Sequence, residues 1–151
     1  MEVRKPGPNQ NCMVTAQSRK DHRGVGGIVL QNCTITGELV VPKGQAPPFK
    51  SYLGRPWKEF SRTIIMNSFI DSNIDPEGWA VWNGNFALDT LYYAELMNRG
   101  PGSDQSKRVP WRGIQKISPQ QAESFTGGKF FLGDEWVRAS GIPYEPGMIK
   151  A

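Results

Sequence analysis

The sequence predicts an all-β protein, and three observations support this fold class. Its 151 residues include 17 glycines and 12 prolines, a content that favours many turns and short elements. Runs of β-favouring residues recur along the chain, and each is closed by polar or turn residues. Two of these runs share an asparagine at a predicted corner. Together these features favour a β-solenoid, in which each coil buries its inward side chains against neighbouring coils.

The predicted strands are rich in valine, isoleucine, threonine, tyrosine and tryptophan, the residues that are enriched in strands. In chain order they occupy residues 13–17 (MVTAQ), 27–35 (GIVLQNCTI), 62–70 (RTIIMNSFI), 79–82 (WAVW) and 90–96 (TLYYAEL).

The runs at 27–35 and 62–70 share a more specific pattern than alternation. In each, β-formers or long side chains precede an asparagine, Asn32 or Asn67, which is followed by a small residue and an apolar return. Asparagine tolerates the left-handed conformation and bonds its own backbone, so a strand, a corner and a second strand are predicted. The Pro- and Gly-rich segment 37–51 between them is expected to be an excursion loop. A β-sandwich is the alternative, but it requires more even spacing and hairpin dipeptides.

The last third of the chain changes character. Ser118 is a predicted N-cap and Pro119 a predicted first helical residue, which indicates a short helix. The following segment, 133–147, contains many glycines and prolines and is expected to be an irregular tail. We expect Trp136 and Tyr144 to anchor this tail across an open end of the solenoid.

Charge and composition narrow the function classes. Eighteen lysines and arginines against fourteen aspartates and glutamates give a net charge of +4, which favours an acidic partner. The basic residues are spread along the chain without a nucleic-acid-binding motif, so an acidic polysaccharide fits better than nucleic acid. The apolar runs are too short for a membrane span. The amino terminus shows no signal-peptide core, so a cytosolic location is the literal prediction.

The sequence predicts no metal site. A single histidine, His22, provides too few ligands for a zinc site, and the two cysteines, Cys12 and Cys33, lack C-x-x-C spacing. The residues alone leave open whether the two cysteines are free thiols or form one disulfide.

The loop "SYLGRPWKEFSRT" at 51–63 holds the most informative candidate site residue, Arg55. Pro56 fixes its own φ and restricts Arg55 to extended geometry, while Gly54 allows the backbone to turn just before it. The planar guanidinium of Arg55 suits bidentate binding of a carboxylate, and Trp57 points to the same side if the stretch is extended. The pair therefore predicts either a site for an acidic sugar or a structural ion pair beside a packing tryptophan.

Several stretches in order resemble the carboxyl-terminal half of plant pectin methylesterases, the pectinesterase family. They are "VTAQSRKD", "GIVLQNCTI", "YLGRPWKEFSRTIIMNSFID", "GWAVWNGNFALDTLYYAELMNRGPGS" and "SGIPYEPG". The resemblance implies a right-handed parallel β-helix that demethylates pectin (homogalacturonan) in the cell wall, without metal or cofactor. It also implies secretion to the apoplast, and it suggests a pectin methylesterase inhibitor protein as a partner. By the same resemblance, residues 1–151 form one partial catalytic domain, with coils over about 10–115 and a helix and tail over about 116–151.

The resemblance also assigns roles. In the family an aspartate attacks the ester carbonyl, a second aspartate acts as acid and then base, and glutamines form the oxyanion hole. Arg55 corresponds to the arginine that holds the nucleophilic carboxylate, Trp57 to a wall of the cleft, and Trp82 to a second cleft aromatic. The motifs that carry both aspartates lie upstream of Val14 in the family. Little or no esterase activity is therefore expected from this chain alone.

The aspartates in this chain are not expected to replace them. The resemblance aligns Asp89 with a segment that is not catalytic, while Asp71 and Asp75 lie in a turn where aspartate commonly caps the backbone. Two alternatives stay open: a non-catalytic fragment that binds pectin or an inhibitor, and an incomplete gene model of a longer, active enzyme. Cys33 matches a family cysteine whose partner lies upstream, and whether Cys12 replaces that partner is open.

Overall fold

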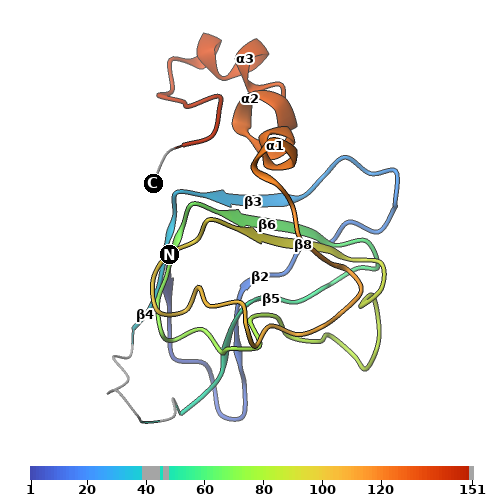
Figure 1. Ribbon diagram of the computed structural model, residues 1–151, viewed down its shortest axis with the longest axis vertical. Coiled ribbons are helices and arrows are strands. Elements are labelled where there is room, and N and C mark those ends of the chain that lie inside the picture. The colour runs from blue at the N-terminus through green and yellow to red at the C-terminus, as the bar shows by residue number, and fades with distance from the viewer. Residues whose placement is uncertain (39–44, 46–47, 150–151) are drawn as a thin grey trace.

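The fold consists of parallel strands that the chain visits in repeated order (Figure 1). The computed structural model describes residues 1–38, 45 and 48–149. A three-stranded sheet has the order β1-β4-β7, with β1 at Glu2–Val3, β4 at Thr34–Gly37 and β7 at Phe69–Ile70. A two-stranded sheet pairs β2, Cys12–Thr15, with β5, Ser51–Gly54. The third sheet has the order β3-β6-β8-β9, at Ile28–Gln31, Arg62–Met66, Tyr92–Leu96 and Ile114–Gln115.

Successive coils add their strands to the same three sheets, so the architecture is a parallel β-helix. The first coil runs through β2, β3 and β4, and the next through β5, β6 and β7 directly below it. Every strand pair is parallel, including Ile28 with Thr63 and Ile35 with Ile70. In the following coil Trp79 bridges to Gly54 and β8 pairs with β6. The predicted fold class is therefore confirmed.

The interior of the helix is apolar and closely packed. The fully buried residues Ile35, Leu53 and Ile65 come from three different sheets and belong to one cluster. Trp79 and Tyr93 stack in the same cluster, with ring centroids 4.3 Å apart. Alternate residues of a strand face opposite sides, so Ile64, the neighbour of Ile65, packs outside the coil.

The predicted asparagine corners are confirmed. Asn32 and Asn67 both adopt the left-handed conformation, with φ values of 52° and 51°. A third corner lies at Met97, with φ 53°, one residue before Asn98. The side chain of Asn98 accepts a hydrogen bond from Ser68 N (3.0 Å) and donates one to the carbonyl of Ile65 (2.9 Å), and both of these residues lie in the preceding coil. The sequence did not reveal this third corner, because its left-handed residue is a methionine and the asparagine is displaced by one position.

The carboxyl-terminal segment contains more helix than predicted. The Ser118 N-cap is confirmed and forms a capping box with Gln121. The segment then contains five short helical elements. They are α1 (Pro119–Ala122), η1 (Glu123–Phe125), α2 (Gly127–Phe130), α3 (Gly133–Trp136) and η2 (Arg138–Ser140). The prediction of an irregular tail after the first helix was therefore wrong for α3. Acidic residues in the first turn of α3 and an Asp134–Arg138 ion pair of 2.9 Å favour the helix despite the nearby glycines.

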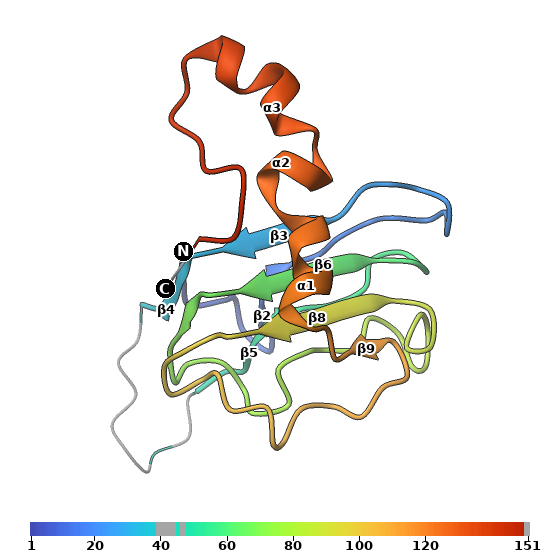
Figure 2. The same ribbon diagram turned by 45° about the horizontal axis from the view of Figure 1, so that its top comes forward.

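α1 lies over the outer face of the four-stranded sheet, whereas α2 and α3 extend beyond its edge at β3 (Figure 2). Ala122 of α1 packs with Ile64, Met66 and Ala94, whose side chains point away from the helix interior. The predicted anchor Tyr144 packs against Gly127 and Gly133, and the position of the tail across an open coil end stays a prediction. Trp136 is no anchor, since 59% of it is exposed.

Residues 79–82 were predicted as a strand, but only Trp79 forms a bridge, and the chain turns at Trp82. Most of the predicted excursion loop at 37–51 lies outside the described residues. Among the helices that the structure describes, none is long and apolar enough to cross a membrane.

Candidate functional site

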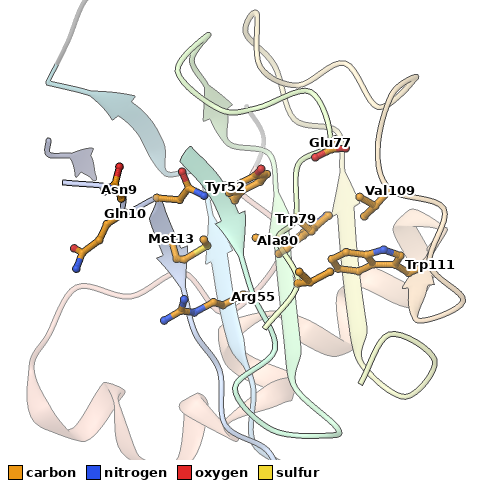
Figure 3. Close-up of a pocket in the computed structure, with 12 residues that line it drawn as sticks. Asn9, Gln10, Met13, Tyr52, Arg55, Glu77, Trp79, Ala80, Val109 and Trp111 are labelled. Carbon is orange, nitrogen blue, oxygen red and sulfur yellow. The ribbon is translucent and has the colours of Figure 1, made fainter. Parts of the chain in front are cut away.

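A groove of about 700 Å³ lies on the outer face of the sheet formed by β2 and β5 (Figure 3). Met13 and Tyr52 are register partners on these strands, and both line the groove. Their neighbours Val14 and Leu53 pack inside the coil, as the alternation of a strand requires. Arg55 lines one part of the groove, while Glu77 and Trp111 reach it from later connections.

The backbone around Arg55 is held tightly in place. Arg55 N donates to the carbonyl of Thr15 in the preceding coil (3.2 Å), and Pro56 is fully buried. A side chain at Gly54 would collide with Thr15 Oγ1, so glycine is required at this close approach between coils. These constraints fix the point from which the Arg55 side chain leaves the backbone.

The guanidinium of Arg55 lies over the ring of Trp82, 4.4 Å from the ring centroid. Its Nε is buried and has no hydrogen-bond partner among the described residues. None of the ion pairs within the described part of the chain includes Arg55. The structure thus presents a cation that has one aromatic contact and an unused donor in a groove. Such a donor is rare in a folded protein and calls for an explanation.

The structure brings together two of the three predicted site residues. Arg55 and Trp82 are in contact, and 44% of Trp82 is exposed. Trp57 is 51% exposed, and neither tryptophan is among the residues that line the groove. The assigned roles of all three residues stay predictions.

Several groove residues were not identified from the sequence. Tyr52 could have been found, because Leu53 is a core residue and alternation turns its neighbour toward the side of Met13. Burial raises the pKa of Tyr52, and the nearby charge of Asp75 raises it further. Trp111 could not have been found, because it is brought to the groove by a connection far along the chain.

The rim of the groove near Tyr52 carries one positively charged and two negatively charged side chains. Lys50 Nζ lies 3.1 Å from Asp75 Oδ2 and 3.9 Å from Glu77 Oε2. It also lies 6.0 Å from the centroid of the Tyr52 ring. The hydrogen bond with Asp75 raises the pKa of Lys50.

The remaining aspartates are placed as the sequence predicts. Asp71 Oδ1 accepts from Ser72 N (2.7 Å), and Asp75 Oδ1 accepts from Glu77 N (3.0 Å), so both cap backbone groups. Asp89 is exposed. Within the described ranges, no three histidine, cysteine, aspartate or glutamate residues are grouped to hold a metal ion.

The two cysteines are free thiols. Cys12 Sγ donates to the carbonyl of Arg4 (3.1 Å), and burial raises the pKa of this thiol. Cys12 and Cys33 are therefore not paired with each other in this structure.

Comparison with known proteins decides the family. The family model for pectinesterase matches residues 1–134. The chain belongs to the pectinesterase family. A pectinesterase of Petunia integrifolia is 54% identical over 151 residues, which cover 98% of this chain and 40% of that protein. The probable pectinesterase/pectinesterase inhibitor 58 of Arabidopsis thaliana is 57% identical over 143 residues, covering 94% of this chain and 25% of that protein.

Solved structures of pectinesterases agree with the fold. Carrot pectin methylesterase superimposes with a TM-score of 0.89 at 46% identity, over 96% of this chain and 46% of that one. The Aspergillus niger enzyme gives a TM-score of 0.57 at 33% identity, over 70% of this chain and 32% of that one. The chain spans about a quarter to two fifths of the length of these plant relatives. The pectinesterase resemblance predicted from the sequence is confirmed.

Proposed function

We propose that this chain supplies the arginine-bearing part of a site that hydrolyses the methyl esters of pectin. The observation that carries the proposal is Arg55, whose buried Nε is unpaired among the described residues and whose guanidinium stacks on Trp82. Stacking holds the cation without neutralising it, so it is ready for an anion. In a pectinesterase groove the fitting anion is a carboxylate.

The chemistry assigned to Arg55 is orientation of a carboxylate nucleophile. That carboxylate attacks the ester carbonyl, methanol leaves with a proton from an acid, and water then cleaves the resulting acyl-enzyme to release the free acid. A bidentate arginine fixes the plane of the attacking carboxylate, and orientation of this kind lowers the barrier. Because no described carboxylate is paired with Arg55, we infer that the chain alone binds pectin without demethylating it.

The substrate class follows from the same groove. Homogalacturonan combines sugar rings, which pack on aromatic side chains such as Tyr52 and Trp111 of the groove, with carboxylates, which a protein of net charge +4 attracts. Action on pectin places the protein in the cell wall, and we propose secretion to that compartment.

The test combines turnover and binding with the purified 151-residue protein. Methanol release from methyl-esterified polygalacturonate is expected to stay at the background rate. Binding of galacturonate oligomers, followed by tryptophan fluorescence, is expected to weaken at least tenfold in Arg55→Ala and to be partly retained in Arg55→Lys. Turnover near that of a full-length pectinesterase would refute the inferred inactivity, and unchanged binding by Arg55→Ala would refute the role of Arg55.

A second candidate is a non-catalytic binding module, favoured by the exposure of Trp57 outside the groove. Trp57 and Trp82 are both about half exposed, which suits contact with pectin or with a pectin methylesterase inhibitor protein. In this case Trp57→Ala abolishes binding to pectin or to the inhibitor, and salt weakens it. If Trp57→Ala leaves both interactions unchanged, this candidate is eliminated.

A further inference from the structure

The connection that precedes β8 contains an asparagine followed directly by a glycine, Asn83 and Gly84, and this is the only such pair in the sequence. All residues at 81–86 are exposed. The segment is made of turns, and Phe86 N donates to the carbonyl of Asn83 (3.0 Å). The pair therefore lies in contact with solvent, outside the strands of the coil.

The two polar groups of this pair that can react with each other have no protein partner. Within the described residues, no hydrogen bond uses the side-chain amide of Asn83 or the backbone N–H of Gly84. Gly84 has a φ of 51°, and a side chain added there would point into open space. Because glycine carries no Cβ, nothing on this residue shields its nitrogen either. The Asn83 amide and the Gly84 nitrogen are thus held back by neither hydrogen bonding nor packing.

An unshielded pair of this kind undergoes a known reaction of asparagine, which is among the thermolabile residues of proteins. The deprotonated nitrogen of Gly84 attacks Cγ of Asn83, a C–N bond forms, and the side-chain amide group leaves as ammonia with the proton that Gly84 N gave up. Water then adds to one of the two carbonyls of the cyclic imide and opens the ring. The product is aspartate or isoaspartate, and water is the only co-reactant.

We propose that Asn83 is a site of spontaneous deamidation, which places a negative charge beside the aromatic partner of Arg55. Asn83 directly follows Trp82, whose ring centroid lies 4.4 Å from the Arg55 guanidinium. The reaction also lowers the net charge of +4 by one. A unit charge about 10 Å from an anion in a water-like dielectric repels it by an amount equivalent to about twofold in affinity. The deamidation stands on the geometry of the pair, whereas its effect on galacturonate binding rests on the proposed function.

The deamidation is tested by incubating the purified chain at mildly alkaline pH, where the attacking nitrogen loses its proton more readily. Peptide mass spectrometry is expected to show a gain of about 1 Da at Asn83, and enzymatic methylation is expected to detect isoaspartate. Asn83→Gln is expected to remove the isoaspartate, because the longer side chain forms a less favourable ring. Gly84→Ala is expected to slow the mass gain about tenfold, because a Cβ crowds the attacking nitrogen and restricts its backbone.

Asn85 is the internal control, because it is an exposed asparagine of the same segment that is followed by the bulky Phe86. It is expected to keep its amide while Asn83 reacts. An unchanged mass at Asn83, or equal rates at Asn83 and Asn85, would overturn the proposal.

The effect on binding is measured with Asn83→Asp, which reproduces the aspartate product. In fluorescence titrations with hexagalacturonate it is expected to bind about twofold more weakly than the wild type at low salt, and equally at high salt. Gln120→Glu is the matched control, because it adds the same charge at an exposed residue of α1, and it is expected to bind as the wild type does.

The possible results of this titration separate the two proposals. Equal affinities of Asn83→Asp and the wild type would overturn the effect of the modification on binding. Failure of the wild type to bind hexagalacturonate would overturn the proposed function, while the mass measurement still decides whether Asn83 deamidates. Thermal unfolding of each variant shows whether an affinity change comes from misfolding.

Discussion

Two arginines of this chain, Arg108 and Arg55, lie in opposite electrostatic situations. Arg108 forms two hydrogen bonds to Glu95, of 2.7 and 2.9 Å, and further bonds to the carbonyls of Pro76 and Gly102, of 3.0 and 2.7 Å. Its side chain is 6% exposed and that of Glu95 3%. Arg55 has an aromatic contact with Trp82 and a buried Nε without a partner in the described residues.

This difference separates a stabilising charge from an available one. Arg108 ties the loop at 100–110 to β8 and to the turn before Trp79, and its hydrogen bonds are satisfied within the protein. A buried pair of this kind depends on both partners, because either charge alone is left uncompensated. Arg55 has no charged partner among the described residues, so its Nε–H can donate a hydrogen bond to a ligand or to a carboxylate. The same residue type is thus fully hydrogen-bonded within the fold in one place and keeps an unused donor in the other.

The largest expected effect on stability comes from replacing Arg108 by alanine, and the same substitution at Arg55 serves as the comparison. Arg108→Ala leaves Glu95 buried without a counter-charge, and a loss of about 3–5 kcal/mol of unfolding free energy is expected. Arg55→Ala removes a partner of Trp82 only, and a change within about 1 kcal/mol is expected. Urea unfolding of the two variants measures both values. Equal losses would show that Arg55 is as structural as Arg108.

An intermediate effect on stability is expected at the third corner, where the side chain of Asn98 has its hydrogen-bond partners within the protein, as Arg108 does. Asn98→Ala removes the acceptor of Ser68 N and the donor to the Ile65 carbonyl. A loss of about 1–3 kcal/mol is expected, because Ser68 N is left without a partner in a partly buried position. The same urea titration checks this value. A matched variant, Asn83→Ala, changes an exposed asparagine outside the corners, and its unfolding free energy is expected to stay close to that of the wild type.

The smallest effect concerns Asp104, an exposed carboxylate in the loop that Arg108 holds. Hydrogen bonds from the backbone and side chain of Ser106 lower the pKa of Asp104. A lowered folded-state pKa stabilises the fold above the ordinary aspartate range, and this contribution is lost as the pH falls through the folded pKa. Asp104→Asn is therefore expected to be slightly less stable than the wild type at neutral pH, with the difference disappearing below about pH 4. Thermal unfolding over pH 2–7 measures it, and a difference that grows on acidification would contradict the assignment.

The parts of this fold that could be predicted are those with local causes. Asn32 and Asn67 mark their own corners because asparagine tolerates positive φ, and Ser118 marks its helix because it caps the next turn. Met97 occupies an equivalent corner without such a preference, so tertiary packing alone places it there.

The candidate site also contains residues that could be predicted from the sequence and residues that could not. The resemblance identified Arg55 and Trp82, and the structure adds their contact. Trp111 and Glu77 reach the groove through strand register and through connections whose paths no local pattern specifies. The outward apolar residues of β6 were visible in the sequence, but their covering by the carboxyl-terminal helices was not, because it is a contact between distant segments.

The stacking of one coil on the next also has a consequence for how such a protein diversifies. Corners and strands repeat with little freedom, since Gly54 already leaves no room for a side chain against Thr15. The groove walls at Glu77 and Trp111 belong to connections between strands, whose lengths the coils do not dictate. Insertions and substitutions in these connections can therefore reshape the groove while the coils beneath keep their structure.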